Sequence, residues 1–378
     1  MWQPGSMSKG AILGSAALAA VSAVRATRTI ATWRTVEPLP DTAVDGGKVS
    51  VVIPVRDEEK TIDGCLASLR TQRHADLEIV VVDDASTDRT VEIVQEHVDA
   101  DPRVRLIRTD GPPTGWAGKV HAMFQGVAET SGDWLLFVDS DTESAPDLVG
   151  KLLAAAARDD ADLITTPGRP TLANSGWWLL LAPTNVLLFE SASPNGSRGK
   201  AVGIGHCILV RRTAYDKAGG WRALSGERAD DVAFATAVRD AGGRTRLVDG
   251  MDSLTSSGLD SFADVWRSQR KSAVAGGAMV GGPAVGAAVL GLAGLAHVGY
   301  GLAPVLMSLR GRGFPRLAGL AAWAAQSAAH RSYMRACHMS TATSVFAPAA
   351  NATFGVLLLD AAWRSLRGGD LWKGRDIR

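Results

Sequence analysis

The segment Trp134-Leu135-Leu136-Phe137-Val138-Asp139-Ser140-Asp141 constrains the fold of this chain more than any other. It is an apolar run of strand length that ends in two acids one residue apart. Because side chains at i and i+2 of a strand point to the same side, Asp139 and Asp141 can aim two carboxylates at one point. Ligands bind at the C-terminal edge of an open α/β sheet, and hard oxygen ligands there suit Mg²⁺ or Mn²⁺. The alternative is an ordinary solvated loop, in which Asp is common anyway.

Strands and helices are expected to alternate around this segment. Runs of β-branched and apolar residues predict strands at 49–54, 77–82 and 104–107. Helices are expected at 59–73, 90–98 and 118–129, with Ser86 and Asp88 placed to cap the second of them. This alternation indicates βαβ units and a mostly parallel sheet. No GxGxxG follows the first strand and no GxxxxGK[ST] occurs, so dinucleotide and P-loop sites lack their phosphate cradle.

Acidic residues follow three successive predicted strands. They are Asp57-Glu58-Glu59, Asp83-Asp84, and Asp139 with Asp141. Each cluster by itself is more often a set of loop acids than a ligand set, but three at one sheet edge argue against chance. Such a crevice suits a base N–H, ribose hydroxyls and a divalent cation, whereas a phosphate there requires a metal or backbone donors.

Charge and cysteine content exclude several classes of protein. The formal net charge is +1, so no basic surface indicates a nucleic-acid partner. The three cysteines, Cys65, Cys207 and Cys337, lie far apart and form no CxxC pair. Neither a zinc site nor a disulfide framework is indicated, which fits a reducing compartment.

Both ends of the chain have membrane character. Gly10–Val24 is apolar and is followed by Arg25, Arg28 and Arg34, which the positive-inside rule places in the cytoplasm. The alternative is a buried terminal helix. Near the other end, residues 273–309 are long enough for two short spans with a break near 297–300, and 341–363 is another candidate. Residues 317–329 are apolar but short, which suits the membrane interface, and a basic tail suggests a cytoplasmic C-terminus. The alternative for this part is a helical soluble domain with a core rich in Gly and Ala.

These patterns divide the chain into three parts. We expect an N-terminal membrane anchor and linker at 1–48, an α/β enzyme domain at 49–272, and C-terminal membrane helices with a basic tail at 273–378. The protein would then be a multi-pass protein of the cell membrane with a cytoplasmic catalytic domain. The stretch 174–190, with Trp177 and Trp178, is either an interfacial helix or an ordinary core helix.

The order and spacing of several segments resemble the inverting glycosyltransferases of family 2, which have the GT-A fold. The segments are Val51-Val52-Ile53-Pro54-Val55-Arg56-Asp57-Glu58, Val80-Val81-Val82-Asp83-Asp84-Ala85-Ser86-Thr87-Asp88, Gly118-Lys119, Asp139-x-Asp141, Gly203 to Arg212, and Gly219-Gly220-Trp221. Ala229-Asp230-Asp231-x-x-Phe234 is similar to the family's Glu-Asp motif, with Asp at 230. Trp266-Arg267-Ser268-Gln269-Arg270 is only loosely similar to Gln-x-x-Arg-Trp.

A narrower resemblance is to the hopene-associated and carotenoid-type membrane glycosyltransferases. It rests on Gly115-Trp116-Ala117-Gly118-Lys119-x-x-Ala122-x-x-x-Gly126, on Asp230-Asp231, on the C-terminal apolar segments and on Trp372-Lys373-Gly374-Arg375. It implies a nucleotide-sugar donor, UDP- or GDP-linked, and a lipid acceptor of hopanoid, carotenoid or polyprenyl type.

The family resemblance also implies roles for individual residues. Asp231 would be the general base, with Asp230 beside it, although an Asp at a helix start is also a common N-cap. Asp139 and Asp141 would hold the metal, while Asp57 and Asp84 would bind base and ribose, with Asp83 the neighbour easily confused with Asp84. Lys119 either reaches the donor or is a solvated lysine. Pro54, Arg56, Glu58, Arg267 and Arg270 complete the candidate donor site, and His206 is expected to be structural.

Two other classes of protein share such a fold. A sugar-nucleotide pyrophosphorylase would carry a Gly-rich, basic phosphate loop after the first strand, which Pro54-Val55-Arg56-Asp57 is not. A non-catalytic membrane scaffold would be expected to lose its acids, whereas here they persist at each strand end.

Overall fold

The computed structural model describes residues 9–171, 178–197, 200–227, 229–278, 280–367, 371–372 and 375–376. The chain forms two compact units. The α/β unit comprises Thr35–Leu172 and Ser191–Asp260, and the helical unit comprises Met1–Arg34, Ala173–Glu190 and Ser261–Arg378. This division by contacts assigns 173–190 and 261–272 to the helical unit, whereas the charge pattern of the sequence groups them with the enzyme domain.

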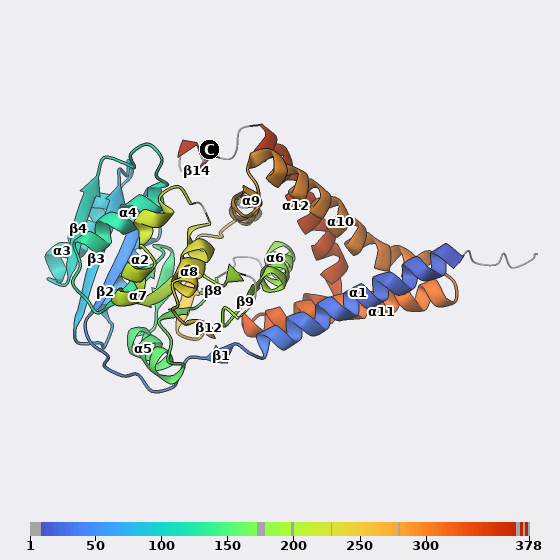
Figure 1. Cartoon of the computed structure of the whole chain (residues 1–378), viewed down its shortest axis with the longest axis horizontal. Helices are drawn as coiled ribbons and strands as arrows, with labels where there is room; N and C mark the ends of the chain where they lie inside the picture. The colour runs from blue at the N-terminus through green and yellow to red at the C-terminus, as the bar shows by residue number, and fades with distance from the viewer. Residues whose placement is uncertain are drawn as a thin grey trace, which may run out of the picture. The chain divides into compact units, whose positions relative to one another are not determined.

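An eight-stranded sheet forms the centre of the α/β unit, with the order β1-β12-β7-β11-β5-β2-β3-β4 (Figure 1). All neighbouring strands are parallel except β11, which runs antiparallel to both β5 and β7. The expected mostly parallel sheet is therefore confirmed. Its strands are β1 (Glu37–Pro38), β2 (Val49–Val55), β3 (Leu77–Asp84), β4 (Val104–Thr109), β5 (Trp134–Val138), β7 (Leu163–Thr165), β11 (Cys207–Arg211) and β12 (Thr245–Asp249).

Helices cover both faces of this sheet, as parallel βαβ connections require. On one face α2 (Ile62–Arg70), α3 (Thr90–Ala100) and α5 (Leu148–Arg158) pack on strand residues such as Val51 and Val81. On the other face α4 (Gly118–Ala128), α7 (Arg212–Lys217), the 3₁₀ turn η2 (Trp221–Leu224) and α8 (Asp230–Asp240) pack on residues such as Val52 and Phe137. The two faces alternate along each strand, so odd and even positions of β3 face opposite layers.

Two small sheets complete the α/β unit. One has the order β6-β13-β8, formed by β6 (Thr142–Ser144), β13 (Leu254–Ser256) and β8 (Arg169–Pro170). The other pairs β9 (Ala192–Ser193) with β10 (Lys200–Ala201). Because β6 begins at Thr142, the first small sheet starts at the residue that follows Asp141.

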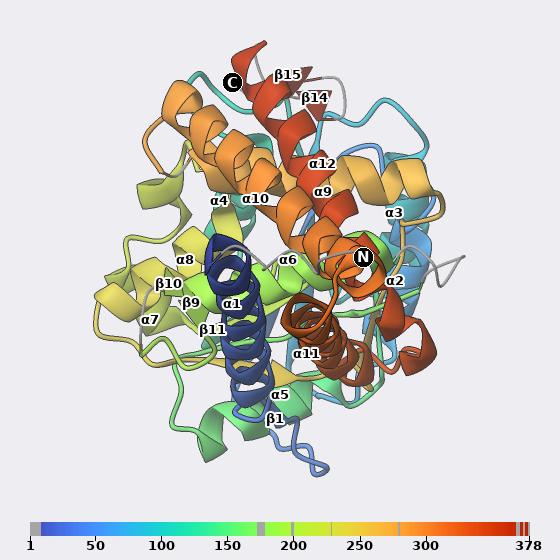
Figure 2. The same cartoon turned by 90° about the vertical axis from the view of Figure 1, so that its right-hand side faces the viewer.

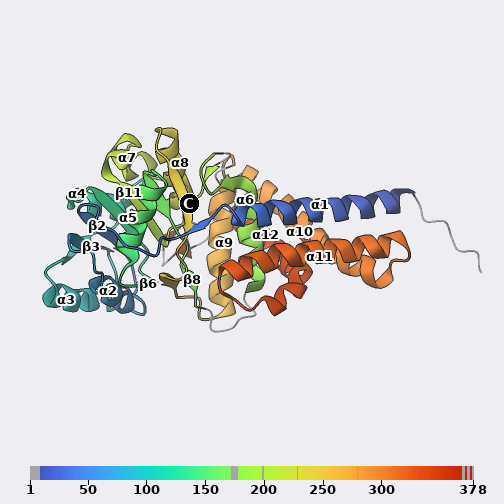
Figure 3. The ribbon, with the colours of Figure 1, turned by 90° about the horizontal axis from the view of Figure 1, so that it is seen from below.

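The helical unit contains the longest helices of the chain, several of them apolar. They are α1 (Lys9–Trp33), α6 (Trp178–Ser191), α9 (Phe262–Ala278), α10 (Pro283–Arg310), α11 (Phe314–Ala336) and α12 (Ala347–Leu366), with a 3₁₀ turn η3 (Thr341–Phe346) before α12 and a short pair β14 (Leu371–Trp372) and β15 (Arg375–Asp376) after it. Within this unit α10 packs along α12 (Figure 2), and α1 runs beside α11 (Figure 3).

Among the described residues, three segments are long and apolar enough to cross a membrane. They are Lys9–Trp33, Pro283–Arg310 and Thr341–Leu366. Small residues bring α10 and α12 together: a side chain added at Gly294 would lie 2.9 Å from the carbonyl oxygen of Gly355. Close packing through small residues is typical of helices that associate in a lipid bilayer.

Some local expectations differ from the structure. Residues 283–310 form one continuous helix with no break at 297–300, because Gly and Ala within it are compatible with a helix that packs closely on a neighbour. Ser86 does not cap α3; its hydroxyl accepts the Asp57 N–H at 3.0 Å, and Asp88 accepts the Thr90 N–H at 3.0 Å instead. Trp177 and Lys373 lie outside the described residues.

Candidate active site

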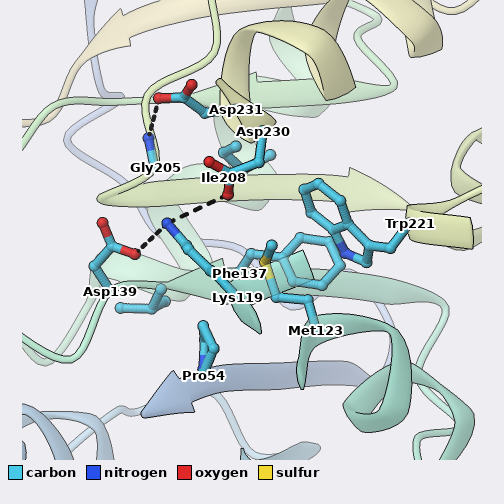
Figure 4. Close-up of a pocket in the computed structure, with 11 residues that line it drawn as sticks. Pro54, Lys119, Met123, Phe137, Asp139, Gly205, Ile208, Trp221, Asp230 and Asp231 are labelled. Atoms are coloured by element: carbon cyan, nitrogen blue, oxygen red, sulfur yellow. Dashed lines mark hydrogen bonds and ion pairs between the residues drawn. The ribbon is translucent and has the colours of Figure 1, made fainter. Parts of the chain in front are cut away.

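A pocket of the α/β unit opens beside the C-terminal ends of β2 and β5 (Figure 4). Its lining combines three carboxylates and one ammonium with aromatic rings, among them that of Trp221. The Trp221 ring stacks on the ring of Phe234 behind it, with the ring centroids 4.3 Å apart. The lining residues are Pro54, Lys119, Met123, Phe137, Val138, Asp139, Gly205, Ile208, Trp221, Asp230 and Asp231. Five of the predicted site residues therefore meet in one place: Pro54, Lys119, Asp139, Asp230 and Asp231.

Lys119 joins two acidic motifs that are far apart in the sequence. It lies in the first turn of α4, and its Nζ is 2.7 Å from Oδ1 of Asp139 and 3.5 Å from Oδ2 of Asp230 (Figure 4). Burial disfavours the ammonium form, but the adjacent carboxylates of Asp139 and Asp230 outweigh this and raise the pKa of Lys119. Lys119 is thus a fixed positive charge in the pocket rather than a solvated surface lysine.

Asp231 is held in place by backbone donors. Its Oδ2 accepts the Gly205 N–H at 3.1 Å, and its Oδ1 accepts the Val232 N–H at 2.8 Å. Burial and the neighbouring Asp230 raise the pKa of Asp231 to about 6, although Lys119 and the two backbone donors act in the opposite direction. A carboxylate with a pKa close to neutrality on a fixed helix is suited to accept a proton. The expected helix at Asp230 is confirmed by α8.

Asp139 and Asp141 lie on a turn rather than on a strand. β5 ends at Val138, and the N–H and hydroxyl of Thr142 both donate to the carbonyl oxygen of Asp139, at 3.2 and 2.8 Å. Burial, and then the negative charge of Asp139, raise the pKa of Asp141 to about 6. The Oδ1 atom of Asp141 is buried and accepts no hydrogen bond from any described residue. Both carboxylates are at the sheet edge, as expected, but the turn places them there.

Two glycines shape the pocket from the β11 side. A side chain at Gly205 would lie 3.1 Å from Nζ of Lys119 and 3.2 Å from Oδ2 of Asp139. A side chain at Gly203 would lie 2.0 Å from the carbonyl oxygen of Asp231, so the two backbones could not keep this approach. The segment was recognised in the sequence by its resemblance, but its packing role depends on a contact with α8 that no local pattern predicts.

The strand register separates Asp84 from Asp83. Val80 and Val82 face α4, so Asp84, two residues further on, faces the same layer as Asp139 and Lys119. Asp83 faces the opposite layer, where it accepts the Ser86 N–H at 3.1 Å and pairs with Arg108 at 3.7 Å. This geometry favours Asp84 as the ligand-facing residue.

The other strand-end acids belong to two loops that are bonded to each other. The Asp57 Oδ1 accepts the Thr87 N–H at 2.7 Å, and the Glu58 N–H donates to the Thr90 hydroxyl at 2.7 Å. Arg56 donates from Nη1 to the carbonyl oxygen of Asp84 at 2.6 Å. Asp57 has a φ of +50°, which is unusual for a residue with a side chain. The hydrogen bond from Arg56 to the carbonyl oxygen of Asp84 holds the loop after β3 in place.

The remaining predicted residues have structural partners. Arg267 and Arg270 lie on α9 of the helical unit, where Arg267 pairs with Asp264 and Arg270 lies 3.0 Å from Asp360 of α12. His206 accepts the Gly168 N–H on Nδ1 at 3.0 Å, which supports the structural role expected for it. Cys65 and Cys207 are buried in the core of the α/β unit.

Asp139, which lines the pocket, and Asp141, two residues further on, are the residues that could hold a divalent metal. Among the described residues, no three His, Cys, Asp or Glu side chains form a cluster that could hold a metal by themselves. Mg²⁺ sites in phosphate-transferring enzymes commonly use one or two carboxylates and take their remaining ligands from phosphate and water. Asp139 and the buried Asp141 Oδ1, which has no hydrogen-bond donor among the described residues, fit that pattern.

In an open α/β sheet, ligands bind in the crevice at the carboxyl ends of the strands, and this pocket lies beside the ends of β2 and β5. Residues 50–219 match the family model described as Glycosyl transferase family 2, so this part of the chain is similar to a family 2 glycosyltransferase domain.

Several proteins of known type are similar to parts of this chain. The 4,4'-diaponeurosporenoate glycosyltransferase of Staphylococcus haemolyticus is 39% identical over 95 residues, which cover 25% of this chain and 24% of that protein. The probable glycosyltransferase YdaM of Bacillus subtilis is 30% identical over 203 residues, covering 51% of this chain and 46% of that protein. The chain thus spans less than half the length of these relatives.

A solved structure shares the fold. The mannosyltransferase PcManGT from Pyrobaculum calidifontis, in complex with GDP-Man and Mn²⁺, matches with a TM-score of 0.58 at 18% sequence identity. The match covers 94% of this chain and 98% of that chain. It supports a GT-A-like α/β fold with additional helices.

The close approach of Gly205 to the charged side chains leads to a prediction. Gly205→Ala would force Lys119 or Asp139 to move by a few tenths of an ångström, because its methyl group lies 3.1–3.2 Å from both. We expect about a tenfold or larger loss of kcat/KM, since small misplacements at a reacting centre are costly. Gly226→Ala, which adds only an ordinary 3.5 Å contact, is the matched control and should retain activity. Equal kinetics of the two variants would contradict the assignment of this pocket.

Proposed function

We propose that this protein is a membrane-bound glycosyltransferase that moves a sugar, with inversion, from a nucleoside-diphosphate sugar to a hydroxyl or phosphate of a lipid. The observation that carries the proposal is the pocket in which Lys119, Asp139 and Asp231 meet, beside a part of the chain that is similar to a family 2 glycosyltransferase domain. Such a pocket has a group for each requirement of the reaction: a base, a positive charge for the leaving group, and fixed positions for both.

The donor would lie along the edge formed by β2, β3 and β5. Asp84 and Asp57 would bind base and ribose, as the family resemblance implies, and the diphosphate would extend toward Asp139 and Asp141. A divalent metal held by these two acids, Mg²⁺ or Mn²⁺, would neutralise the charge of the leaving diphosphate. The similar fold that was solved with GDP-Man and Mn²⁺ supports this placement. Lys119 would add a second positive charge on the same side.

Asp231 would act as the general base. The acceptor oxygen attacks the anomeric carbon on the face opposite the diphosphate, and its proton passes to the Asp231 carboxylate. The new carbon–oxygen bond forms as the bond to the diphosphate breaks, and the nucleoside diphosphate leaves with the electron pair. A single displacement of this kind inverts the anomeric centre. The pKa of about 6 keeps Asp231 ionised at neutral pH while leaving it basic enough to accept the proton.

A lipid acceptor is supported by the three apolar segments and by the relative that acts on 4,4'-diaponeurosporenoate. Helices of this length and composition would keep the enzyme at the bilayer, where a lipid hydroxyl or phosphate is concentrated. The acceptor class therefore includes carotenoid, hopanoid and polyprenyl-type lipids.

The donor part of the proposal is tested by nucleotide binding. Purified full-length protein in detergent is titrated with UDP and with GDP, each in the presence of Mn²⁺, Mg²⁺ or EDTA, and heat release is measured. We expect one nucleotide to bind tightly only when a divalent ion is present. Failure of both nucleotides to bind under every metal condition would refute a nucleotide-sugar donor of either kind.

The three apolar segments also predict sidedness. With the α/β unit in the cytoplasm, α10 would run outward and α12 inward, so residue 312 would be external and residue 367 cytoplasmic. Both arginines are exposed at helix ends, and the native cysteines Cys65, Cys207 and Cys337 are buried. In intact cells, Arg312→Cys should react with an impermeant thiol reagent, and Arg367→Cys should react only after lysis. The reverse pattern would overturn this topology.

A further inference from the structure

We propose that Lys119 is a resident counter-cation that competes with the metal for Asp139, so that metal and donor diphosphate bind as a pair rather than independently. The inference rests on the proposed function and deepens it. It assigns Lys119 and Asp230 a role in the order of binding, in addition to their place in the pocket lining.

The pocket lining has more carboxylates than ammonium groups. Asp139, Asp230 and Asp231 line the pocket together with a single ammonium, and Asp141 lies close enough to Asp139 for the two charges to interact. Lys119 resolves part of this imbalance by contacting Asp139 at 2.7 Å and Asp230 at 3.5 Å. With 25% of its side chain exposed, Lys119 is largely withdrawn from water, and its two ion pairs are screened less than surface pairs.

The Lys119 ammonium and a metal cannot share Asp139 comfortably. A divalent ion coordinates carboxylate oxygen at about 2.0–2.1 Å. An ammonium hydrogen-bonded to Oδ1 of the same carboxylate would stand within a few ångströms of that ion, so like-charge repulsion would oppose simultaneous binding. In the absence of donor, the metal must therefore displace Lys119 from Asp139, and this cost lowers the apparent affinity for metal.

The donor removes this cost. A diphosphate brings new anionic oxygens, which supply further ligands to the metal and a new partner for Lys119. Lys119 needs only a short movement, because Gly205 leaves open the space beside its ammonium. Asp230, which lies 3.5 Å from Nζ while Lys119 contacts Asp139, would remain a partner of the displaced lysine. The two neighbouring acids of α8 thus have different tasks: Asp231 faces the Gly205 N–H, and Asp230 positions Lys119.

Coupled binding of this kind is reciprocal: a nucleotide diphosphate strengthens metal binding by the same factor by which metal strengthens nucleotide binding. Removing the ammonium should free Asp139 for metal in the absence of donor. It should also reduce the factor by which nucleotide strengthens metal binding, because no lysine then has to be displaced.

The test measures free Mn²⁺ by electron paramagnetic resonance during titration of full-length protein in detergent. For Lys119→Met without nucleotide, we expect Mn²⁺ to bind at least about tenfold more tightly than to the wild type, the scale of a lost charge-assisted hydrogen bond. Lys119→Arg keeps the positive charge and should bind Mn²⁺ as weakly as the wild type. Adding Asp139→Asn to Lys119→Met should abolish the gain, which places the site at Asp139.

Two controls separate local competition from general electrostatics. Lys151→Met removes a lysine that pairs with Asp147 on α5, away from the pocket, and should leave Mn²⁺ affinity unchanged. Repeating the titrations at high salt screens long-range fields, so the difference between Lys119→Met and wild type should persist there. Asp230→Asn, which removes the other partner of Lys119, should bind Mn²⁺ no more tightly than the wild type.

Equal Mn²⁺ affinity of wild type and Lys119→Met, without nucleotide and in folded protein by circular dichroism, would overturn the inference. A gain that survives Asp139→Asn would overturn it as well. The proposed function fails separately: a gain of Mn²⁺ binding at Asp139 in a protein that binds neither UDP nor GDP would support the lysine's role and refute the nucleotide donor.

Discussion

Asp231→Asn is expected to lower the turnover number for sugar transfer by about 10²–10⁴-fold, because an amide cannot accept the acceptor proton. Donor and metal affinity should change little, because the Asp231 carboxylate is bonded to Gly205 and Val232 rather than to Asp139 or Asp141. A collapsed kcat with unchanged nucleotide binding is the pattern of an interaction needed in the transition state. Steady-state kinetics and calorimetry on the same preparation give both quantities. Retained turnover with lost donor affinity would make Asp231 a binding residue instead.

The raised pKa of Asp231 predicts how the stability of the protein and its kcat/KM depend on pH. Its pKa in the folded protein, about 6, lies above the ordinary aspartate value of 3.8, so the folded state binds more protons between these values. The contribution of Asp231 to stability is therefore lost as pH rises through about 6, and ionised Asp231 opposes folding at neutral pH. Asp231→Asn should consequently unfold at a similar or higher temperature than the wild type at pH 7.5. Wild-type kcat/KM should fall as pH drops below about 6.

Asp141→Asn is expected to reduce transfer by about 10²-fold or more, because it removes one of two carboxylates available to a metal that neutralises the leaving group. Asn keeps the shape of Asp141, whose carboxylate is buried and has a pKa raised to about 6 by burial and by Asp139. The fold should therefore persist while Mn²⁺-dependent nucleotide binding weakens. EDTA treatment of the wild type should reproduce the loss, and added Mn²⁺ should restore it.

Asp147→Asn is a suitable control for that variant. Asp147 pairs with Lys151 on α5 at 3.0 Å, and its loss should leave transfer unchanged. Normal transfer by Asp141→Asn, with or without added Mn²⁺, would remove Asp141 from the candidate metal site. Transfer by the wild type that is insensitive to EDTA would argue against any metal in the reaction.

Much of the sheet was predictable from the sequence because its strands are buried on both faces. Strands of this kind appear as continuous apolar runs, and those at 49–54, 77–82 and 104–107 correspond to β2, β3 and β4. The observed strands extend slightly further, and β3 continues through Asp83 and Asp84. A hydrophobic pattern does not include acidic residues at the end of a strand, so the predicted strands end too early.

The candidate site was predictable as a set of residues but not as an arrangement. Asp139 and Asp141 were expected to point the same way because of strand alternation, whereas the Thr142 turn places them at the sheet edge. Asp83 and Asp84 could not be separated until the register of β3 assigned each to a face. The Lys119 ion pairs join α4, the turn after β5, and α8, and contacts between such distant segments leave no local signal.

The helical unit was the hardest part to predict. Composition indicated apolar segments, but it did not indicate that α10 would be one continuous helix of 28 residues. Nor did it indicate that Trp266 and Arg270 would both bond to Asp360. The family motif implies that Arg267 and Arg270 bind the donor; that role stays a prediction, to be weighed against the link that Arg270 forms between α9 and α12.

Transfer to lipid is the central claim, and it is measured most directly by mass spectrometry of the lipid product. Purified full-length protein is reconstituted into vesicles of total membrane lipid and supplied with UDP- or GDP-sugars and Mn²⁺, with Asp231→Asn as the matched inactive enzyme. We predict a lipid whose mass increases by one sugar residue, formed by the wild type and absent with Asp231→Asn. Release of nucleoside diphosphate without any glycosylated lipid, or equal product from both proteins, would contradict the account.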